Sequence, residues 1–334
     1  MNLALVYKNI NSPSYIFYKD ALKKIEKNNK SIKVFFEKFS QKTFEKKFDI
    51  ILFMSGAIKK NFKKGKNIKY GIVDPRAANY DNFENFDFII ANGLEEKFFF
   101  SYTGLPTMIY PTFPTISCKK KNNRNKTIIT YHGNKEHLEN MHPRITRAFQ
   151  KISKNYKVEL RLIYNIKDKG IVKEVNKSNL NCVVSHLQYY DGCLNKYLSN
   201  TDIGIVPQLK ILKKRKIKKN IGYFLSKQLF KRQYSFNLNF KETTNLGRHF
   251  VFAQCKIPVI SDYTLSSSNF INHKKNGILA YDTEDWYQST KFLIDNKKRS
   301  NQIGKQLFKD WKTYFSHEVL NRKMLNFLRK LNAK

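Results

Sequence analysis

A chain of 334 residues is longer than one ordinary hydrophobic core supports, so we expect two domains. Hydrophobic residues make up 41% and aromatic residues 14%, which is enough to fold without a cofactor, and no apolar run reaches the ~18 residues of a transmembrane helix. The net charge of +37 predicts a polyanionic neighbour, namely anionic lipid, nucleic acid or an anionic glycan, with a coding bias towards Lys, Asn and Ile as the alternative explanation.

Residues 1–115 alternate short apolar runs with helical patterns. Runs rich in Ile, Val and Phe that end in polar residues, Gly or Pro predict parallel strands covered by helices on both faces. No basic region precedes the first run, so we expect a first strand there and not a signal peptide. The predicted strands are Leu3–Tyr7, Ile32–Phe36, Asp49–Met54, Lys69–Val73, Asp87–Ala91 and Thr107–Pro111.

Residues 116–126 are charged, polar and aperiodic, which predicts a linker, and the alternation then resumes over residues 127–315. The strands predicted there are Thr127–Thr130, Val158–Tyr164, Cys182–Leu187, Asp202–Val206, Pro258–Ser261 and Gly277–Ala280, and the helices are His137–Lys154, Asp191–Ser199 and Leu246–Gln254. The tail is helical in period, and Ser316 is a candidate N-cap for a last helix within residues 316–334. Two doubly wound α/β domains would face a cleft at the carboxyl ends of their strands.

The segment 209–241 interrupts this rhythm. It contains eleven Lys and Arg residues and no acidic residue, and aromatic side chains follow its basic run. Part of the spacing suits an amphipathic helix with a basic border. Three interpretations stay open: contact with an anionic membrane, nucleic-acid binding, for which no motif is present and which we regard as the weakest, or a solvated loop.

The order of motifs near the end of the chain is the most informative feature. Asn245-Leu-Gly-Arg248 opens a predicted helix, Lys256–Ser261 reads as a Pro-led buried strand, and Asn276–Leu279 and Glu284–Trp286 follow. A helix start with exposed N–H groups and an Arg in its first turn suits a diphosphate. This order resembles the nucleotide-sugar half of the GT-B glycosyltransferases of group 1 and related enzymes. The resemblance implies two Rossmann-like domains and a last helix that crosses back to the first domain.

The resemblance also implies a set of donor-binding residues. Asn245, Gly247 and Arg248 would hold the donor diphosphate, and Lys241 is a second cationic candidate. Gly133 follows the first strand of the second domain, and His186 and Pro207 lie at the ends of its third and fourth predicted strands. The alternative for each is an ordinary turn residue.

In the first domain, several polar residues follow strands and are candidates for the acceptor side. They are Ser55, Arg76 and Asn92. Asp74 is the best-placed carboxylate for a catalytic base, although Asp-Pro is also ordinary turn chemistry. In the second domain, His132 is a candidate ligand contact or general acid/base, with a structural role as the alternative.

Two positions depart from the family pattern. Val251 stands where many group 1 enzymes place a Glu that holds the donor ribose, and Lys256 stands where they have a Gly. Glu242, just before the helix, is the alternative candidate for the ribose contact.

Cysteine usage bears on the compartment. Cys118, Cys182, Cys193 and Cys255 show no CxxC spacing and several have apolar neighbours, so we expect buried free thiols in a reducing compartment. The expected location is the cytoplasm, with peripheral contact to the inner face of the membrane through residues 209–241 as an option.

The sequence thus predicts a glycosyltransferase that moves a sugar from a nucleotide-diphosphate sugar to a glycan or lipid-linked acceptor in surface-polysaccharide or glycolipid synthesis. No cofactor and no metal are expected, because the fold stabilises a leaving diphosphate with a helix dipole and cations. The alternative is a non-catalytic GT-B relative that binds a glycan or acts as a scaffold.

Overall fold

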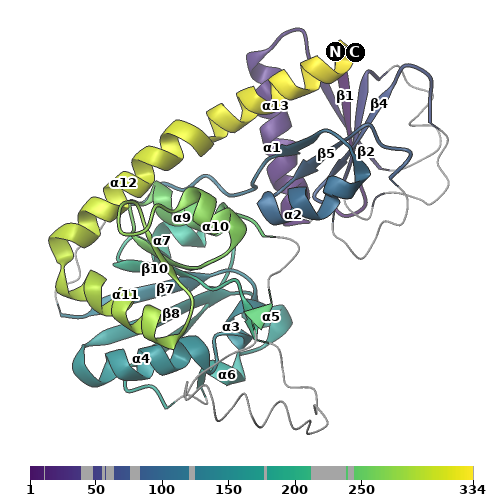
Figure 1. Cartoon of the computed structure of the whole chain (residues 1–334). Helices are drawn as coiled ribbons and strands as arrows, with labels where there is room; N and C mark the ends of the chain where they lie inside the picture. The colour runs from purple at the N-terminus through teal and green to yellow at the C-terminus, as the bar shows by residue number, and fades with distance from the viewer. Residues whose placement is uncertain are drawn as a thin grey trace, which may run out of the picture. The chain divides into compact units, whose positions relative to one another are not determined.

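The computed structural model describes residues 1–10, 12–38, 48–54, 57, 64–75, 83–119, 125–176, 179–211, 238–239 and 244–333 (Figure 1). These residues belong to two compact units. Unit 1 contains Met1–Ile116, Glu242–Gln254 and Leu307–Lys334, and unit 2 contains Ser117–Lys241 and Cys255–Gln306. The chain therefore passes between the units four times.

Unit 1 is built on a parallel sheet of six strands in the order β2-β1-β3-β4-β5-β6. The strands are β1 (Asn2–Tyr7), β2 (Lys33–Lys38), β3 (Ile50–Met54), β4 (Lys69–Val73), β5 (Phe88–Ala91) and β6 (Thr107–Ile109). The three central strands β3, β4 and β5 consist almost entirely of buried residues, as expected for a sheet covered on both faces. This is a doubly wound sheet whose strand order reverses at β1, next to β3.

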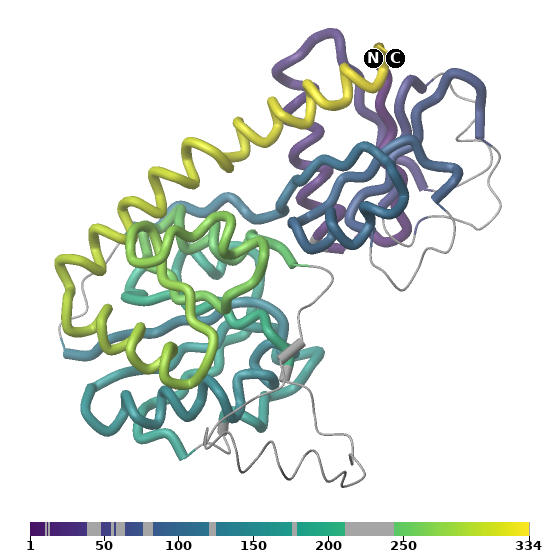
Figure 2. The backbone as a smooth tube through the Cα atoms, viewed as in Figure 1, coloured from purple at the N-terminus to yellow at the C-terminus, as the bar shows by residue number. Residues whose placement is uncertain are grey.

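The helices of unit 1 come from both ends of the chain. They are α1 (Pro13–Asn28), α2 (Leu94–Phe99), the 3₁₀ helix η3 (Phe100–Thr103), α9 (Gly247–Gln254) and α13 (His317–Asn332). The long helix α12 (Lys297–Phe315) begins in unit 2 and ends in unit 1, after which α13 packs beside α1. In Figure 2 the purple start and the yellow end of the tube accordingly meet in the same unit. The last helix thus returns to the first sheet, as predicted, and Ser316 caps it by accepting a hydrogen bond from the N–H of Val319.

Unit 2 contains a second parallel sheet of six strands in the order β14-β13-β10-β7-β8-β9. The strands are β7 (Thr127–His132), β8 (Val158–Tyr164), β9 (Val183–Gln188), β10 (Ile203–Val206), β13 (Val259–Asp262) and β14 (Ile278–Ala280). Counted from β7, this is the 3-2-1-4-5-6 order of dinucleotide-binding domains, and the order reverses between β7 and β10. Every strand predicted from the sequence is present, within one or two residues at each end.

The remaining elements of unit 2 cover this sheet or lie at its rim. The helices are α3 (Lys135–Glu139), α4 (Arg144–Asn155), α5 (Ile166–Lys169), α6 (Lys173–Asn176), α7 (Cys193–Tyr197), α10 (Leu265–Phe270) and α11 (Thr283–Asp295), and a small antiparallel pair is formed by β11 (Lys210–Ile211) and β12 (Leu238–Asn239). The single helix expected over 137–154 is two helices, because Pro143 lacks an N–H and restricts the residue before it. Most of the predicted basic segment 209–241, including its predicted amphipathic helix, lies outside the described residues.

The two units differ from the domains drawn from the sequence at one point. Residues 244–254 and 307–315 had been placed in the second domain, whereas they cluster with unit 1. The reason is that α9 packs on the segment that leaves β6, with Phe113 and Phe250 ring centroids 5.0 Å apart. Among the helices of the described ranges, none is both long enough and apolar enough to cross a membrane.

Candidate functional site

The carboxyl ends of three neighbouring strands in unit 1 carry a connected set of polar side chains. Asp74 follows β4, Asn92 follows β5, and Thr112 follows β6. All three are buried, with 4%, 6% and 7% of their surface exposed. Buried polar groups at this edge of a parallel sheet are where ligand sites of doubly wound domains form.

Asp74 is the centre of this set. One of its carboxylate oxygens accepts a hydrogen bond from the Ser14 hydroxyl at 2.7 Å, and the other accepts from the side-chain amide of Asn92. Its φ of 51° lies in the left-handed region, which a non-glycine residue adopts only where its surroundings impose it. These two bonds hold the Asp74 carboxylate in a fixed orientation, and each oxygen of a carboxylate can accept more than one bond. As it stands, the carboxylate orients Ser14 and Asn92.

Further hydrogen bonds connect these polar side chains to the start of α9, the helix that the sequence predicted to open at Asn245-Leu-Gly-Arg248. The Thr112 hydroxyl donates to the Asn92 side-chain oxygen at 3.4 Å, and the Asn245 amide donates to the Thr112 carbonyl and hydroxyl oxygens at 3.0 and 2.9 Å. The Asn245 oxygen then accepts from the N–H of Gly247 at 2.8 Å. Four residues predicted for three different roles therefore belong to one hydrogen-bonded network, namely Asp74, Asn92, Asn245 and Gly247. Together with Ser14 and Thr112 we call it the edge network.

A close contact with the backbone of Thr112 requires glycine at position 247. A Cβ atom at this position would lie 2.2 Å from the carbonyl oxygen of Thr112, so only glycine lets α9 begin against the backbone that leaves β6. Arg248, in the first turn of α9, is half-buried. The predicted glycine turn at the start of a helix is thus present, and it belongs to unit 1.

Buried acids surround the edge network. The side chains of Glu95 and Glu96, in the first turn of α2, are 9% and 0% exposed, and Glu96 accepts from the N–H of Asn92 while Glu95 accepts from the Thr244 hydroxyl. Burial, reinforced by the charges of Asp74 and Glu96, holds the pKa of Tyr18 well above its ordinary value.

In unit 2 the corresponding edge lies at the reversal of strand order. His132 ends β7, Gly133 follows it, and Pro207 follows the neighbouring strand β10, so two predicted donor residues and the candidate acid/base His132 lie on adjacent strands. Gly133 has a φ of 138°, a conformation that favours glycine, and its N–H is bonded to the Ile163 carbonyl. Ligands of doubly wound domains bind at such a reversal.

His186 lies elsewhere. It is on β9, the edge strand, which β8 separates from β7. Its ring Nδ1 lies 2.9 Å from the Tyr164 hydroxyl, and burial lowers the pKa of the imidazole. The structure does not bring His186 to the reversal point. The sequence places His186 near the end of a strand but does not say which strands become neighbours in the sheet, so it could not show this.

A buried ion pair that the sequence did not reveal holds the loop after β10. Asp262, at the end of β13, accepts two bonds from the Arg144 guanidinium at 2.7 and 2.8 Å, and both side chains are fully buried. Asp262 also accepts from the N–H groups of Gln208 and Leu209, and from the Trp286 indole. The pair therefore fixes the backbone next to Pro207. No sequence signal marks it, because an Arg in the first turn of an amphipathic helix ordinarily faces solvent.

Three predicted site residues, Ser55, Arg76 and Lys241, lie outside the described residues, as does Glu242. Across the described ranges, no group of three or more His, Cys, Asp or Glu side chains is arranged to hold a metal ion. The absence of a metal requirement stays a prediction.

We compared the sequence and the structure with those of known proteins. No protein-family model matches the sequence, and no curated protein matches it. Solved structures do: sucrose-phosphate synthase from Thermosynechococcus elongatus superimposes with a TM-score of 0.65 over 99% of both chains at 13% identity. Anabaena HepE in complex with UDP and glucose gives a TM-score of 0.61 over 99% of this chain and 100% of that one at 11% identity. The lipopolysaccharide outer core galactosyltransferase WaaB gives 0.63 over 98% of both chains at 10% identity.

The chain has the GT-B glycosyltransferase fold. Its two departures from the GT-B pattern of group 1 enzymes now have a structural description. Val251 is fully buried in α9, so this position belongs to the core of unit 1. Lys256 has a φ of 55°, a left-handed conformation just beyond the end of α9 that explains why a glycine suits this place.

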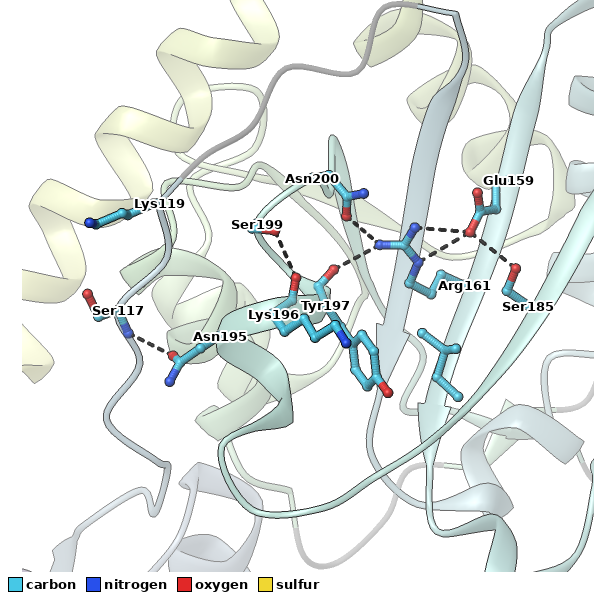
Figure 3. A pocket seen from close by; sticks show the side chains of 11 residues that line it. Ser117, Lys119, Glu159, Arg161, Ser185, Asn195, Lys196, Tyr197, Ser199 and Asn200 are labelled. Carbon is cyan, nitrogen blue, oxygen red and sulfur yellow. Dashed lines mark hydrogen bonds and ion pairs between the residues drawn. The ribbon is translucent and has the colours of Figure 1, made fainter.

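A pocket on unit 2 of this GT-B chain lies away from the reversal point. It encloses about 700 Å³ on the face of the sheet that α7 covers, and Figure 3 shows Glu159, Arg161 and Ser185 projecting into it from β8 and β9. Arg161 donates to Glu159, to Asn200 and to the Tyr197 carbonyl, and Lys126 pairs with Glu159 at 2.6 Å. Arg161 and Glu159 are thus bonded to neighbours within the protein, and Lys119 and Lys196 also line the pocket.

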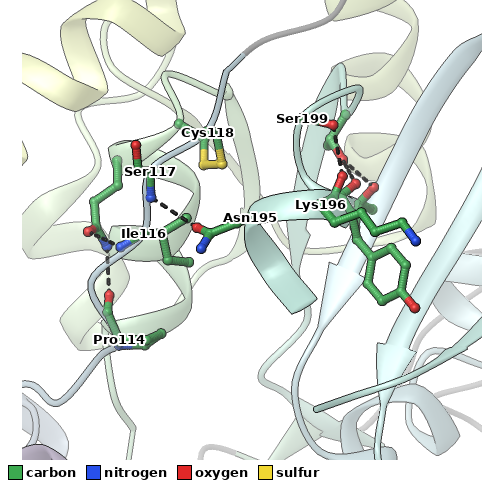
Figure 4. Close-up of a disulfide and its surroundings, with 12 residues drawn as sticks. Pro114, Ile116, Ser117, Cys118, Asn195, Lys196 and Ser199 are labelled. Carbon is green, nitrogen blue, oxygen red and sulfur yellow. Dashed lines mark hydrogen bonds between the residues drawn. A yellow bond between two sulfur atoms is a disulfide. The ribbon is translucent and has the colours of Figure 1, made fainter. Parts of the chain in front are cut away.

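The expectation of four free thiols is wrong for two cysteines. Cys118 and Cys255 form a disulfide, although 137 residues separate them (Figure 4). Beside it, the N–H of Ser117 donates to the Asn195 side chain at 3.0 Å. Cys182 and Cys193 keep free thiols, as predicted, and burial raises the pKa of both. The sequence could not predict this disulfide, because the two cysteines are far apart in the chain. Cys118 lies in a polar linker, and Cys255 lies just beyond a helix.

Proposed function

We propose that the protein transfers a sugar from a nucleotide-diphosphate sugar to a glycan or lipid-linked acceptor in surface-polysaccharide or glycolipid synthesis. The observation that carries the proposal is the glycine turn at the strand reversal of unit 2, where Gly133 and Pro207 stand on adjacent strands. Full-length likeness in fold to HepE, solved with UDP and glucose, and to WaaB, a lipopolysaccharide galactosyltransferase, supports the donor and acceptor classes.

In this proposal the donor nucleotide binds at the reversal point of unit 2. The backbone around Gly133 approaches the diphosphate closely, and the loop held by Asp262 and Arg144 supplies the facing wall. Arg248 and Lys241 stay the predicted cations for the charge that develops on a leaving diphosphate. No metal ion is required.

The edge network of unit 1 serves the acceptor. Asn92 and Thr112 are held in fixed orientations by Asp74 and Asn245, so they would present hydrogen-bonding groups to acceptor hydroxyls. Asp74 takes the proton of the attacking hydroxyl once Ser14 rotates away from its carboxylate. His132 remains a second candidate for a catalytic or binding role.

Calorimetric titration with UDP, GDP, ADP and CMP tests the donor site directly. One nucleotide should bind in the micromolar range, equally well with Mg²⁺ or EDTA, and Arg248→Ala should weaken it about tenfold, as removal of one charge-assisted bond does. Arg322→Ala, on the exposed face of α13, is the matched control for loss of a positive charge. Binding that disappears with EDTA and returns with Mg²⁺ contradicts metal independence.

The buried Val251 supports a second candidate function, a non-catalytic GT-B protein that binds a glycan or acts as a scaffold. A Val in the core offers no carboxylate to the donor ribose. In that case none of the four nucleotides binds, whereas the acceptor glycan does. A transfer assay with the donor that binds separates the two: sugar transfer by the wild type, lost in Arg248→Ala with the fold intact, requires an enzyme.

A further inference from the structure

One face of the sheet in unit 2 carries charged side chains, whereas both faces of a parallel sheet are ordinarily apolar. Along β8, Val158, Leu160 and Leu162 point to one face and belong to the hydrophobic core. Glu159 and Arg161 alternate with them and therefore point to the opposite face, although they are only 6% and 9% exposed. Buried charges are costly even when they are paired, so their presence on this face requires an explanation.

These two side chains line the pocket beside α7, which we call the β8 pocket. Because α7 is only five residues long, β8 and the edge strand β9 leave a hollow of about 700 Å³ on this face. Pockets of about 300–1,000 Å³ hold small-molecule ligands. Apart from Leu187, every side chain that lines the pocket carries a hydrogen-bonding group, with hydroxyls and amides from Ser185, Ser199, Asn195 and Asn200 among them (Figure 3).

The β8 pocket has a surplus of positive charge. Glu159 is the one acid among its described lining residues, and it accepts from Arg161 at 3.1 and 3.2 Å and pairs with Lys126 at 2.6 Å. Lys119 and Lys196 also line the pocket and are exposed, and neither forms an ion pair with an acid of the described ranges. An anionic group in the pocket therefore meets two cations that no such acid neutralises.

Two further acids lie close to these residues in the chain without lining the pocket. Asp202, at the amino end of β10, accepts a hydrogen bond from the N–H of Ile128 at 2.8 Å. Asp191 is exposed and precedes α7. Since neither pairs with Lys119 or Lys196, the surplus of positive charge at the pocket remains.

Arg161 keeps a donor for a ligand. A guanidinium has five N–H groups, and four of them donate here, two to Glu159, one to the Tyr197 carbonyl and one to the Asn200 side chain. The fifth N–H is on the Nη2 atom. A planar donor beside hydroxyls and amides matches a ligand that carries many hydroxyl groups.

Aromatic rings complete the lining. Tyr197 lines the pocket, and Tyr190 packs against it with ring centroids 6.1 Å apart while 49% of its own surface is exposed. An aromatic ring offers an apolar face beside a polar hydroxyl. Sugar rings have the complementary character, because their C–H groups form apolar patches between their hydroxyls.

We propose that the β8 pocket binds an anionic saccharide, that is, sugar rings that carry carboxylate or phosphate groups. Lys119 and Lys196 bind the anionic groups, and the free N–H of Arg161 and the neighbouring hydroxyls and amides bind the sugar hydroxyls. The pocket lies on β8 and β9, away from the strand reversal between β7 and β10. The inference therefore does not depend on a donor nucleotide at that reversal.

Calorimetric titration of the full chain tests the β8 pocket. Trigalacturonate, which carries carboxylates, or glucose 6-phosphate should bind at least about tenfold more tightly than neutral maltotriose and than inorganic phosphate. The one that binds identifies the anionic group. Lys119→Ala/Lys196→Ala should weaken that binding about tenfold. The matched control Lys298→Ala/Lys305→Ala, which removes two exposed lysines of α12, should change it less than about twofold.

Several results of this titration overturn the proposal. They are binding of neither anionic sugar, equal binding of maltotriose, and unchanged affinity in Lys119→Ala/Lys196→Ala. Inorganic phosphate that binds as tightly as glucose 6-phosphate also overturns it, because the site then recognises an anion and no sugar. UDP should bind the double variant as it binds the wild type. A wild type that binds the anionic sugar but no nucleotide contradicts the proposed function and leaves the β8 pocket supported.

A second readout locates the bound sugar. In Leu187→Trp the new indole lies among the lining residues, so its fluorescence should change when the anionic sugar binds. Tyr263→Trp, just after β13, is the control and should show no change. A change at position 263 without one at position 187 places the sugar elsewhere in unit 2 and overturns the proposal.

Discussion

The Asn245 side-chain amide donates to both the carbonyl and the hydroxyl oxygen of Thr112, at 3.0 and 2.9 Å, and so fastens the start of α9 to the segment that leaves β6. The two residues are 133 positions apart in the chain. Their contact joins the motif that carries the family resemblance to the carboxylate that the sequence nominated as a base. It also makes α9 part of unit 1.

Removal of the Asn245 amide should loosen this junction. Asn245→Ala leaves the Thr112 carbonyl and the Gly247 N–H without partners, so we expect a loss of about 2 kcal/mol in unfolding free energy. Chemical denaturation measures it. Asn326→Ala, at an exposed position of α13, is the control and should change stability by less than about 0.5 kcal/mol. Equal effects of the two substitutions would show that the junction contributes nothing.

Gly247 should tolerate no side chain. Gly247→Ala places a methyl group 2.2 Å from the Thr112 carbonyl, and relief of that overlap must move α9. We expect a loss of about 1–3 kcal/mol, as for overpacking of a core. Thermal unfolding measures the change, and a variant as stable as the wild type would mean that α9 does not pack here.

Lys256→Gly should stabilise the protein. Relief of the left-handed backbone at φ 55° outweighs the greater freedom of glycine in the unfolded chain, so we expect a gain of about 0.5–1 kcal/mol. Lys256→Ala keeps the strain and removes the same charge, which makes it the control. A gain in both variants would assign the effect to the charge of Lys256 and not to its backbone.

Stability should fall in mild acid because of His317. Burial, followed by the charge of Lys24, lowers the pKa of this imidazole to about 4, and its ring stacks on Phe113 with centroids 4.1 Å apart. The unfolded chain takes up the proton near pH 6.5, so the stabilisation is complete above that pH and is lost as pH falls from 6.5 towards 4, by at most about 3 kcal/mol. His317→Phe keeps a stacked ring and should flatten unfolding free energy over this interval. An unchanged pH slope in that variant would contradict the assignment.

The buried pair of unit 2 should be sensitive to loss of one partner. Arg144→Met leaves the Asp262 carboxylate buried without its cation, at a cost of about 3–5 kcal/mol. The double variant Arg144→Met/Asp262→Asn removes both charges and should recover part of that loss. Denaturant unfolding of the three proteins decides the point, and a double variant less stable than Arg144→Met would contradict it.

Sequence patterns predicted the strands well because a fully buried parallel strand is a continuous apolar run, as at Ile50–Met54. They located the glycine turns at Gly133 and Gly247 because a close backbone approach needs glycine. They missed the pairs Arg144–Asp262 and Cys118–Cys255, since such contacts depend on which elements become neighbours in space. For the same reason they assigned α9 to the second domain.

The disulfide has a topological consequence. Cys118 and Cys255 lie within two residues of the points where the chain leaves unit 1 for unit 2, at 116/117 and 254/255. The cross-link therefore closes residues 118–255, which include most of unit 2 and helix α9 of unit 1, into a covalent ring. A protease that cuts the backbone once between residues 119 and 254 leaves the polypeptide in one piece, which runs as two fragments only after reduction.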